Sequence, residues 1–207
     1  RDFGPLVVAW LVAVGILAFQ RDLGTALMFF GVFVILLYVS TQRRSWLIIG
    51  AALFALACVL GYLAFGHVQL RVKIWLDPWQ YANNESYQLV QGLFGLASGG
   101  LFGTGLGEGY PQFIPFAKTD FIAAALGEEL GLAGLFAIVM LFAILVERGL
   151  RTGLACRDAF GTLLAVGLSS VFALQVFVTI GGVTRLIPLT GLTTPFMSQG
   201  GSSLVAY

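Results

Sequence analysis

The sequence predicts an all-α fold, a polytopic membrane helix bundle, and three observations carry that prediction. Of the 207 residues, 58% are hydrophobic and only 10% are charged, whereas soluble domains carry about 25% charged residues. The mean hydropathy is +0.93. The apolar residues also fall into long runs, close to the roughly 20 residues that a helix needs to cross a membrane.

Five runs predict full transmembrane helices, and a sixth predicts only the start of one. They cover residues 5–19, 23–39, 46–65, 130–146 and 160–180, and the sixth begins near Pro195. Pro5 is tolerated at a helix start, where its missing N–H costs little. The polar residues 20–22 end the first run, and Asp22 is expected to start the next helix. Residues 42–44 separate the second run from the third.

Several classes of protein are disfavoured by the composition. The net charge is +1, which offers no basic field for nucleic acid, so no nucleic-acid partner is expected. Cys58 and Cys156 match neither a zinc site nor a disulfide framework. The chain begins at Arg1 without a methionine and stops at Tyr207 inside an apolar pattern. We therefore expect residues 1–207 to form a single membrane domain that is part of a longer protein.

Basic residues in short loops predict the orientation, because cytoplasmic loops are enriched in Lys and Arg. One group lies at an end of the chain and in two short loops: Arg1, Arg43, Arg44, Arg148, Arg151 and Arg157. We assign this group to the cytoplasm. The long loop of residues 67–122 then faces outward.

The outer loop contains two notable segments. Residues 87–102 are apolar but interrupted by Gln88, Gln91 and residues 98–100. This pattern predicts a re-entrant or interfacial helix, because irregular backbone at membrane depth survives only beside protein or a wet cavity. Residues 103–109, GTGLGEG, lack the Lys-Ser/Thr and the preceding strand of a phosphate-binding loop. We expect them to form a flexible turn.

Asp120 is the candidate catalytic residue, because it lies where the polar loop meets an apolar segment. A carboxylate there is costly unless something uses it. Lys118 is a candidate charge partner. The alternative is that Thr119 caps a helix and Asp120 lies in its first turn, favoured by the helix dipole. The helix-start interpretation is preferred for two further acids, Glu128 and Glu129.

The outer loop also supplies three cations, Arg71, Lys73 and Lys118. Cations beside a lipid boundary suit a phosphate or pyrophosphate headgroup, which Arg binds bidentately. The alternative is that Arg71 and Lys73 only extend their charged ends toward the membrane surface.

A series of short motifs occurs in order along nearly the whole chain. They are QRDLGTALM (20–28), DP (77–78), YQLVQ (87–91), SGGLFGTGLG (98–107), TDFI (119–122), GEELGL (127–132), PLTG (188–191) and PFMSQGGSS (195–203). Jointly they resemble the SEDS proteins (shape, elongation, division and sporulation). The IPFAK run before Thr119 is more similar to the RodA branch than to the FtsW branch.

The resemblance implies a ten-helix fold, of which this chain carries the fifth helix to the start of the tenth. It implies a peptidoglycan glycosyltransferase of the bacterial cytoplasmic membrane that polymerises lipid II on the extracellular face during cell elongation or division. It further implies that the leaving group is undecaprenyl pyrophosphate and that the partner is a class B penicillin-binding protein, a transpeptidase. A divalent cation, Mg or Mn, is implied by the family alone.

The resemblance also implies roles for residues. The TDF motif corresponds to the family's catalytic carboxylate, which makes Asp120 the expected general base. The candidate substrate-binding residues are Arg71, Lys73, Lys118, Gln91, Glu108, Ser202 and Ser203; no protein ligand to a metal is expected. The chain departs from the family pattern where Lys118 replaces a frequent His, Gln199 replaces Tyr and Arg21 replaces Pro.

Two other functions remain open at this stage. A lipid II flippase would use the same cations but would need no base. A non-catalytic scaffold for a transpeptidase would depend on interface residues alone.

Overall fold

The computed structural model describes Gly15 and residues 22–199. Between residues 22 and 199 the chain forms six α-helices and two short 3-10 helices, which confirms the predicted all-α class. The α-helices are α2 (Leu23–Thr41), α3 (Ser45–Ala64), α4 (Gly66–Leu76), α5 (Tyr87–Gly99), α6 (Ile122–Ala155) and α7 (Ala159–Val183). The 3-10 helices are η1 (Trp79–Tyr81) and η2 (Pro111–Phe113).

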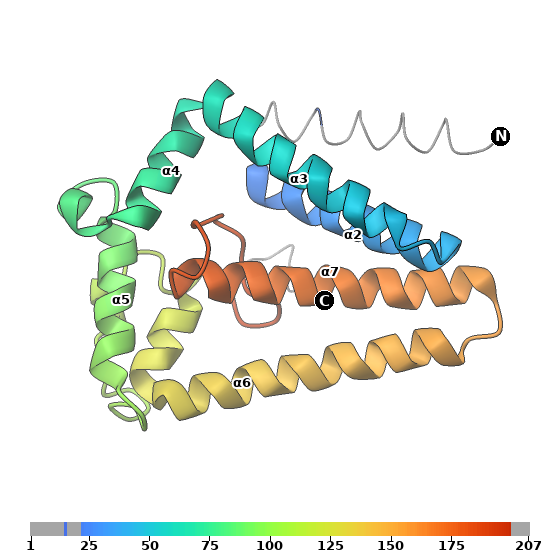
Figure 1. The fold of residues 1–207 in the computed structure, drawn as a ribbon. Coiled ribbons are helices and arrows are strands. Elements are labelled where there is room, and N and C mark those ends of the chain that lie inside the picture. Colours follow the sequence, from blue (N-terminus) through green and yellow to red (C-terminus); the bar gives the residue numbers. More distant parts are fainter. Residues whose placement is uncertain (1–14, 16–21, 200–207) are drawn as a thin grey trace.

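Four of these helices, α2, α3, α6 and α7, are long and apolar enough to cross a membrane. In Figure 1 they run side by side, and α7 contacts both α2 and α6 while α3 packs on α2. They confirm the runs predicted at 23–39, 46–65, 130–146 and 160–180. The run predicted at 5–19, apart from Gly15, and the part of the sixth run beyond residue 199 lie outside the described residues.

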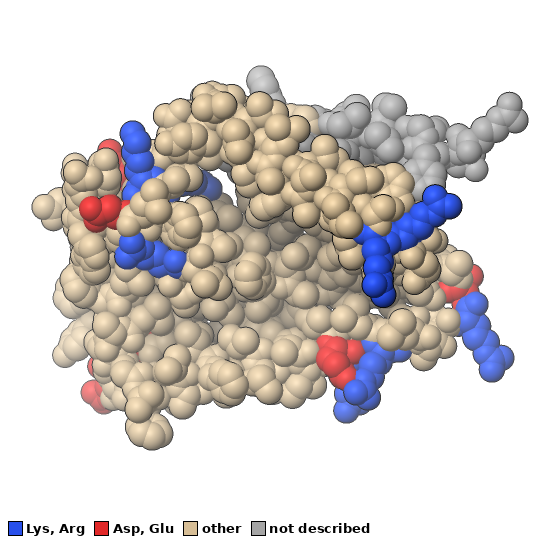
Figure 2. Space-filling model, in the orientation of Figure 1, with Lys and Arg blue, Asp and Glu red and all other residues tan. Residues whose placement is uncertain are grey.

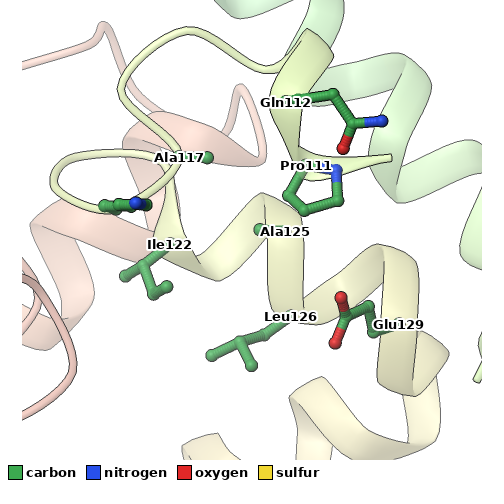
Figure 3. Close-up of a pocket in the computed structure, with 8 residues that line it drawn as sticks. Pro111, Gln112, Ala117, Ile122, Ala125, Leu126 and Glu129 are labelled. Carbon is green, nitrogen blue, oxygen red and sulfur yellow. The ribbon is translucent and has the colours of Figure 1, made fainter. Parts of the chain in front are cut away.

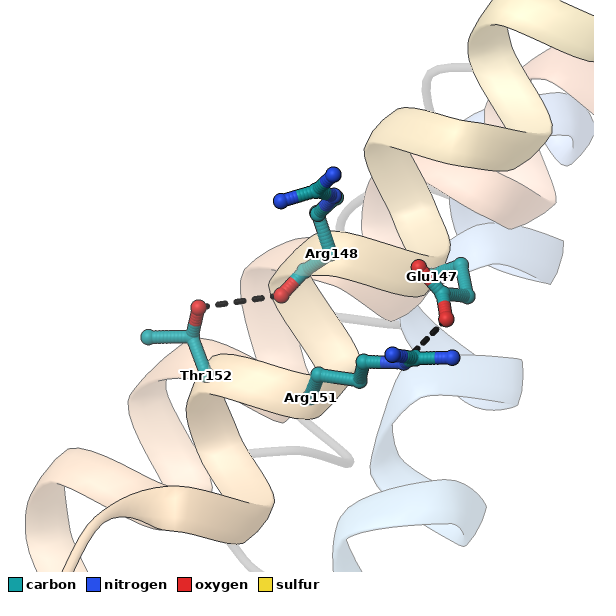
Figure 4. Close-up of polar contacts among 4 residues, drawn as sticks. All are labelled: Glu147, Arg148, Arg151 and Thr152. Atoms are coloured by element: carbon teal, nitrogen blue, oxygen red, sulfur yellow. Dashed lines mark hydrogen bonds and ion pairs between the residues drawn. The ribbon is translucent and has the colours of Figure 1, made fainter.

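Helix α6 is longer than the run that predicted it. It begins at Ile122 rather than at residue 130, and it ends at Ala155 rather than at residue 146. Near its end, Glu147 and Arg151 form an ion pair, and Thr152 Oγ1 donates to the Arg148 carbonyl at 2.9 Å (Figure 4). Charged residues thus end the apolar run but not the helix, because pairs one turn apart support helical structure.

Aspartate side chains cap the N-termini of two of the long helices. Asp22 accepts a hydrogen bond from Thr25 N–H at 3.1 Å and caps α2, which confirms the expectation for this residue. Asp158 caps α7 in the same way, accepting from Gly161 N–H at 2.9 Å. Each side chain satisfies a backbone donor that has no partner inside its helix.

The two ends of the bundle differ in structure. Helices α4 and α5 lie at one end, and α5 runs across that end instead of along the bundle (Figure 1). The α2–α3 and α6–α7 connections, which carry Arg43, Arg44 and Arg157, lie together at the other end. Figure 2 shows charged side chains near both ends of this face and a nearly uncharged middle. The chain is therefore a multi-pass membrane protein.

Helices α5 and α6 pack closely through glycines. A Cβ added at Gly92 would lie 2.6 Å from Phe121 Cδ1, and one at Gly99 would lie 2.1 Å from the Gly127 carbonyl oxygen. A helix was predicted within residues 87–102, and α5 forms there and ends at Gly99. The glycines let its backbone approach the first turns of α6.

Helix α6 is broken at Gly131, whose φ of 69° and ψ of −173° are not helical. Only glycine adopts this conformation readily. Four backbone N–H···O bonds with residues 100–105, at 2.9–3.1 Å, span the break: Thr104 to Glu128, Gly105 to Glu129, Leu132 to Gly100 and Ala133 to Leu101. A flexible turn was expected at residues 103–109. This expectation is wrong for Thr104 and Gly105, whose N–H groups are hydrogen-bonded to α6.

Replacing Gly131 with alanine should lower the free energy of unfolding by about 1–3 kcal/mol from the backbone conformation alone. The new Cβ would also lie 2.3 Å from Gly103 N. Chemical unfolding of the full-length protein in detergent, followed by tryptophan fluorescence, measures the change.

Gly61→Ala is the matched control, because a Cβ at Gly61 in α3 meets nothing within 4 Å. Alanine there should be neutral or slightly stabilising, since it favours helix more than glycine does. Equal stability of the Gly131→Ala and Gly61→Ala proteins would contradict the structural role of the break.

Candidate active site

Phe121 anchors the loop that carries Asp120. Its side chain is fully buried, in a cluster with Leu89, Ala124 and Val183. Burying a phenylalanine side chain contributes about 1.5–3 kcal/mol. Because Asp120 is the preceding residue, the position of its backbone is tied to this buried ring.

Hydrogen bonds to the Phe116 carbonyl stabilise the loop of residues 116–121 internally. The Phe116 carbonyl accepts hydrogen bonds from Thr119 N–H at 2.9 Å, from Phe121 N–H at 3.2 Å and from Thr119 Oγ1 at 3.3 Å. Helix α6 begins at Ile122, its N-cap Phe121 makes no side-chain cap, and its first turn contains no acid. The interpretation of Thr119 as a cap, with Asp120 in the first turn, is therefore wrong.

Asp120 is half-buried. This burial raises the pKa of its carboxyl above the ordinary aspartate value, and a side-chain hydrogen bond involving Thr119 opposes the rise to a smaller extent. Between residues 22 and 199 the single ion pair joins Glu147 and Arg151, so the expected pairing of Lys118 with Asp120 is not formed. A carboxylate that is partly desolvated, and that no cation holds in its charged form, is suited to accept a proton.

The end of the described chain holds the Asp120 loop from another side. Ser198 Oγ donates to the Thr119 carbonyl at 2.7 Å and accepts from Thr194 N–H at 2.7 Å. Gln199 N–H donates to the Lys118 carbonyl at 2.7 Å. Ser198 is buried. These bonds join the segment that contains the PFMSQ residues to the TDF motif.

Residues 188–191, the PLTG motif, form a third segment beside Asp120. A Cβ at Gly191 would lie 3.8 Å from Asp120 Oδ2. Arg71 Nη1 donates to the carbonyls of Leu189 at 3.2 Å and Thr190 at 3.1 Å. Arg71, a predicted site residue, therefore donates to a short segment whose Gly191 lies near Asp120.

Lys118 lines a pocket of about 380 Å³ that Asp120 does not line. The pocket lies between residues 111–118 and the first turns of α6. Figure 3 shows the apolar side chains of Ile122 and Leu126 on one side, with Gln112 and Glu129 on the other. It is a mainly apolar pocket with a few polar groups, next to the Asp120 loop.

The other predicted binding residues are less closely connected to Asp120. Lys73 and Glu108 are exposed, and Gln91 is half-buried on α5. None of the hydrogen bonds found among residues 22–199 joins these three side chains to the Asp120 loop. Two predicted residues, Ser202 and Ser203, lie outside the described part of the chain.

Glu128 is a buried carboxylate that the sequence pattern assigned wrongly to a helix start. It is 5% exposed. Its Oε1 accepts from Tyr110 N–H at 3.1 Å and from Ser98 Oγ at 3.5 Å, and its Oε2 is buried without a hydrogen-bond partner. An acid directly beside a long apolar run was the signal that could have identified it as a buried group.

A divalent cation needs several oxygen ligands. No group of three or more His, Cys, Asp and Glu side chains among the described residues could hold one. The donor set of this part of the chain therefore does not fit a cation bound by protein groups alone, and no step below is assigned to a metal.

A family model described as cell cycle protein, covering FtsW, RodA and SpoVE, matches residues 1–207. The chain belongs to this FtsW/RodA/SpoVE family. The peptidoglycan glycosyltransferase RodA of Mycobacterium bovis is 57% identical over 206 residues, which are 100% of this chain and 44% of that protein. The probable peptidoglycan glycosyltransferase FtsW of Geobacter sp. (strain M18) is 38% identical over 207 residues, which are 98% of this chain and 56% of that protein.

The FtsW/RodA/SpoVE fold is also found in a solved peptidoglycan synthase complex, a structure concerned with the coordination of polymerisation and crosslinking. One of its chains matches with a TM-score of 0.78 and 29% identity, over 99% of this chain and 58% of that chain. The resemblance to the SEDS proteins is thus confirmed. The higher identity to the RodA relative agrees with the predicted branch, and the chain spans less than half of that relative's length, 44%.

Ser198→Ala should loosen the Asp120 loop in this FtsW/RodA/SpoVE protein. It removes the donor to the Thr119 carbonyl and leaves buried backbone groups without partners, which costs about 1–3 kcal/mol. Hydrogen exchange of the full-length protein should show faster exchange in residues 116–121. Ser40→Ala is the control, because Ser40 Oγ donates only within its own helix, to the Leu37 carbonyl at 3.1 Å. Unchanged exchange in Ser198→Ala would contradict the role of this hydroxyl.

Proposed function

We propose that the protein is a peptidoglycan glycosyltransferase that polymerises lipid II into glycan strands. The observation that carries the proposal is a half-buried Asp120 with a raised carboxyl pKa, in a loop fixed by backbone hydrogen bonds. The relatives named as glycosyltransferases support the same reaction class. Because the chain matches only part of their length, the activity is proposed for the full-length protein.

The proposed reaction is an inverting glycosyl transfer. Asp120 removes the proton from the acceptor sugar hydroxyl as that oxygen attacks the anomeric carbon of the donor. The new glycosidic C–O bond forms on the face opposite the breaking bond to pyrophosphate, and undecaprenyl pyrophosphate leaves with the electron pair. A positioned base of this kind contributes typically about 10²–10⁴ in rate.

The charge that develops on the leaving pyrophosphate needs cations. Lys118 and Lys73 are exposed and can turn toward a lipid-borne phosphate. A divalent cation is implied by the family alone, and no step of the reaction is assigned to it. Glu108 and Gln91, together with Ser202 and Ser203, are proposed to contact the sugars or the peptide.

The orientation and partner are part of the proposal. The Arg-rich short connections face the cytoplasm, and α4, α5 and the Asp120 loop face outward, with α5 lying in the membrane interface. A class B penicillin-binding protein is the proposed partner, supported by the solved synthase complex with the same fold.

Asp120→Asn should lower strand synthesis from labelled lipid II by at least about 100-fold, since amides do not accept the proton. The assay uses the full-length protein with its transpeptidase partner at matched expression. Asp158→Asn is the control, because Asp158 caps α7 at the opposite end and Asn caps equally well.

Strand synthesis by Asp120→Asn at the wild-type rate would remove Asp120 from the mechanism. Transport of lipid II without synthesis by the wild-type protein would favour a flippase. The scaffold function would be favoured if the wild-type protein showed neither synthesis nor transport, and if Asp120→Ala still supported the transpeptidase.

As the pH is lowered, strand synthesis should fall at a pH above the ordinary aspartate pKa. Base catalysis needs the charged carboxylate, and burial raises the pKa of Asp120. As the pH falls, the charged form is therefore lost at a value above about 3.9, the ordinary aspartate pKa. The pH profile of kcat/KM for strand synthesis gives the midpoint, with fluorescence showing that the protein stays folded. A midpoint at or below the ordinary value contradicts the desolvated base.

A further inference from the structure

The guanidinium of Arg71 donates hydrogen bonds to backbone carbonyls of the protein itself. Arg71 lies on α4, is half-buried, and donates from one nitrogen to two successive backbone oxygens, those of Leu189 and Thr190. A cation that only extends toward the membrane surface would not bond backbone carbonyls this far along the chain. The contact therefore fixes a segment of main chain in place.

The segment that Arg71 contacts needs such a donor. Helix α7 ends at Val183, and residues 189–199 form no helix. Leu189 packs against the buried cluster around Phe121, so the carbonyls beside it are partly withdrawn from water. A carbonyl in such surroundings is costly without a hydrogen bond, and bonds from charged donors are the stronger ones.

Two further helices hold the same segment. A Cβ at Gly24 of α2 would lie 3.2 Å from the Thr190 carbonyl oxygen, and one at Gly182 of α7 would lie 3.5 Å from Leu189 Cα. The segment is thus enclosed by α2, α4 and α7. Its next residue, Gly191, has a φ of 78° and lies against Asp120, since a Cβ added at Gly191 would be 3.8 Å from Oδ2.

We infer that Arg71 is a positioning residue, which fixes the backbone of residues 189–191 as a wall beside the Asp120 carboxylate. It does not act as a ligand of the leaving pyrophosphate. The inference rests on the proposed function, in that Asp120 is taken as the base. Because Gly191 has no side chain, the acceptor hydroxyl has space to approach Asp120 Oδ2. Arg71 maintains this space by fixing the backbone of residues 189–191.

Arg185 provides a matched comparison, because it also joins α4 to the segment after α7. Its Nε donates to the Trp75 carbonyl at 2.8 Å and its Nη2 to the Leu76 carbonyl at 2.5 Å, while Trp75 Nε1 donates to the Arg185 carbonyl at 3.0 Å. No hydrogen bond found among the described residues links Arg185 to the Asp120 loop. It therefore has the same type of structural contact without the proposed effect on the base.

The experiment compares Arg71→Met, Arg71→Lys and Arg185→Met in the full-length protein with its transpeptidase partner. For Arg71→Met, kcat for strand synthesis should fall by at least about tenfold, the equivalent of one lost hydrogen bond to a charged group, while KM for lipid II stays within twofold to threefold. Arg71→Lys keeps one cationic donor and should be intermediate. Arg185→Met should keep kcat per folded molecule.

Two further measurements separate positioning from ligand binding. In an Asp120→Asn background, Arg71→Met should cause no further loss of the residual rate, because residues that act as a unit are non-additive. In that same inactive background, the Kd for undecaprenyl pyrophosphate should be unchanged by Arg71→Met. If Arg71→Met fails to fold, Arg71→Lys provides both measurements.

The inference is overturned if Arg71→Met or Arg71→Lys weakens undecaprenyl pyrophosphate binding tenfold, which would make Arg71 a phosphate ligand. It is also overturned if kcat is unchanged, or falls equally in Arg185→Met. Failure of the proposed function is distinct: the wild-type protein would then make no strands, or Asp120→Asn would make them normally. The binding measurement would still decide the role of Arg71.

Discussion

Backbone N–H and C=O groups that leave a helix within an apolar bundle must find partners in the protein, because hydrocarbon offers none. This constraint accounts for the irregular parts of the structure. Residues 100–105 supply the bonds that α6 loses at Gly131. Arg71 supplies donors to the segment after α7, and Ser198 supplies one to the Asp120 loop. Each irregular segment is therefore fixed by a segment distant in sequence.

The candidate base depends on the same constraint. Asp120 is held through the backbone of its neighbours: Phe121 is buried, and the Thr119 carbonyl is bonded by Ser198. These contacts are neutral. A cation in contact with the carboxylate would lower the pKa and reduce its basicity, whereas partial burial raises it. A site built from backbone contacts and an aromatic anchor thus orders the carboxylate without neutralising it.

The sequence predicted the four long helices, because these depend on local patterns. It also indicated Asp120 as the candidate base, and that role stays a prediction. Apolar runs reveal membrane helices, and a carboxylate beside such a run is conspicuous. It did not predict the early start of α6, because Glu128 and Glu129 resemble the polar end of a loop. It could not predict the partners of Arg71 or Ser198, which lie 118 and 79 residues away. Such contacts arise from tertiary packing and leave no local signal.

The bond between Ser198 and Thr119 also has a consequence for biosynthesis. The two residues are separated by 79 positions, and ribosomes add about 5–20 residues per second. Thr119 is therefore synthesised roughly 4–16 seconds before Ser198. During this interval the hydrogen bond from Ser198 to the Thr119 carbonyl cannot form, so the Asp120 loop acquires this contact only after residue 198 has been synthesised.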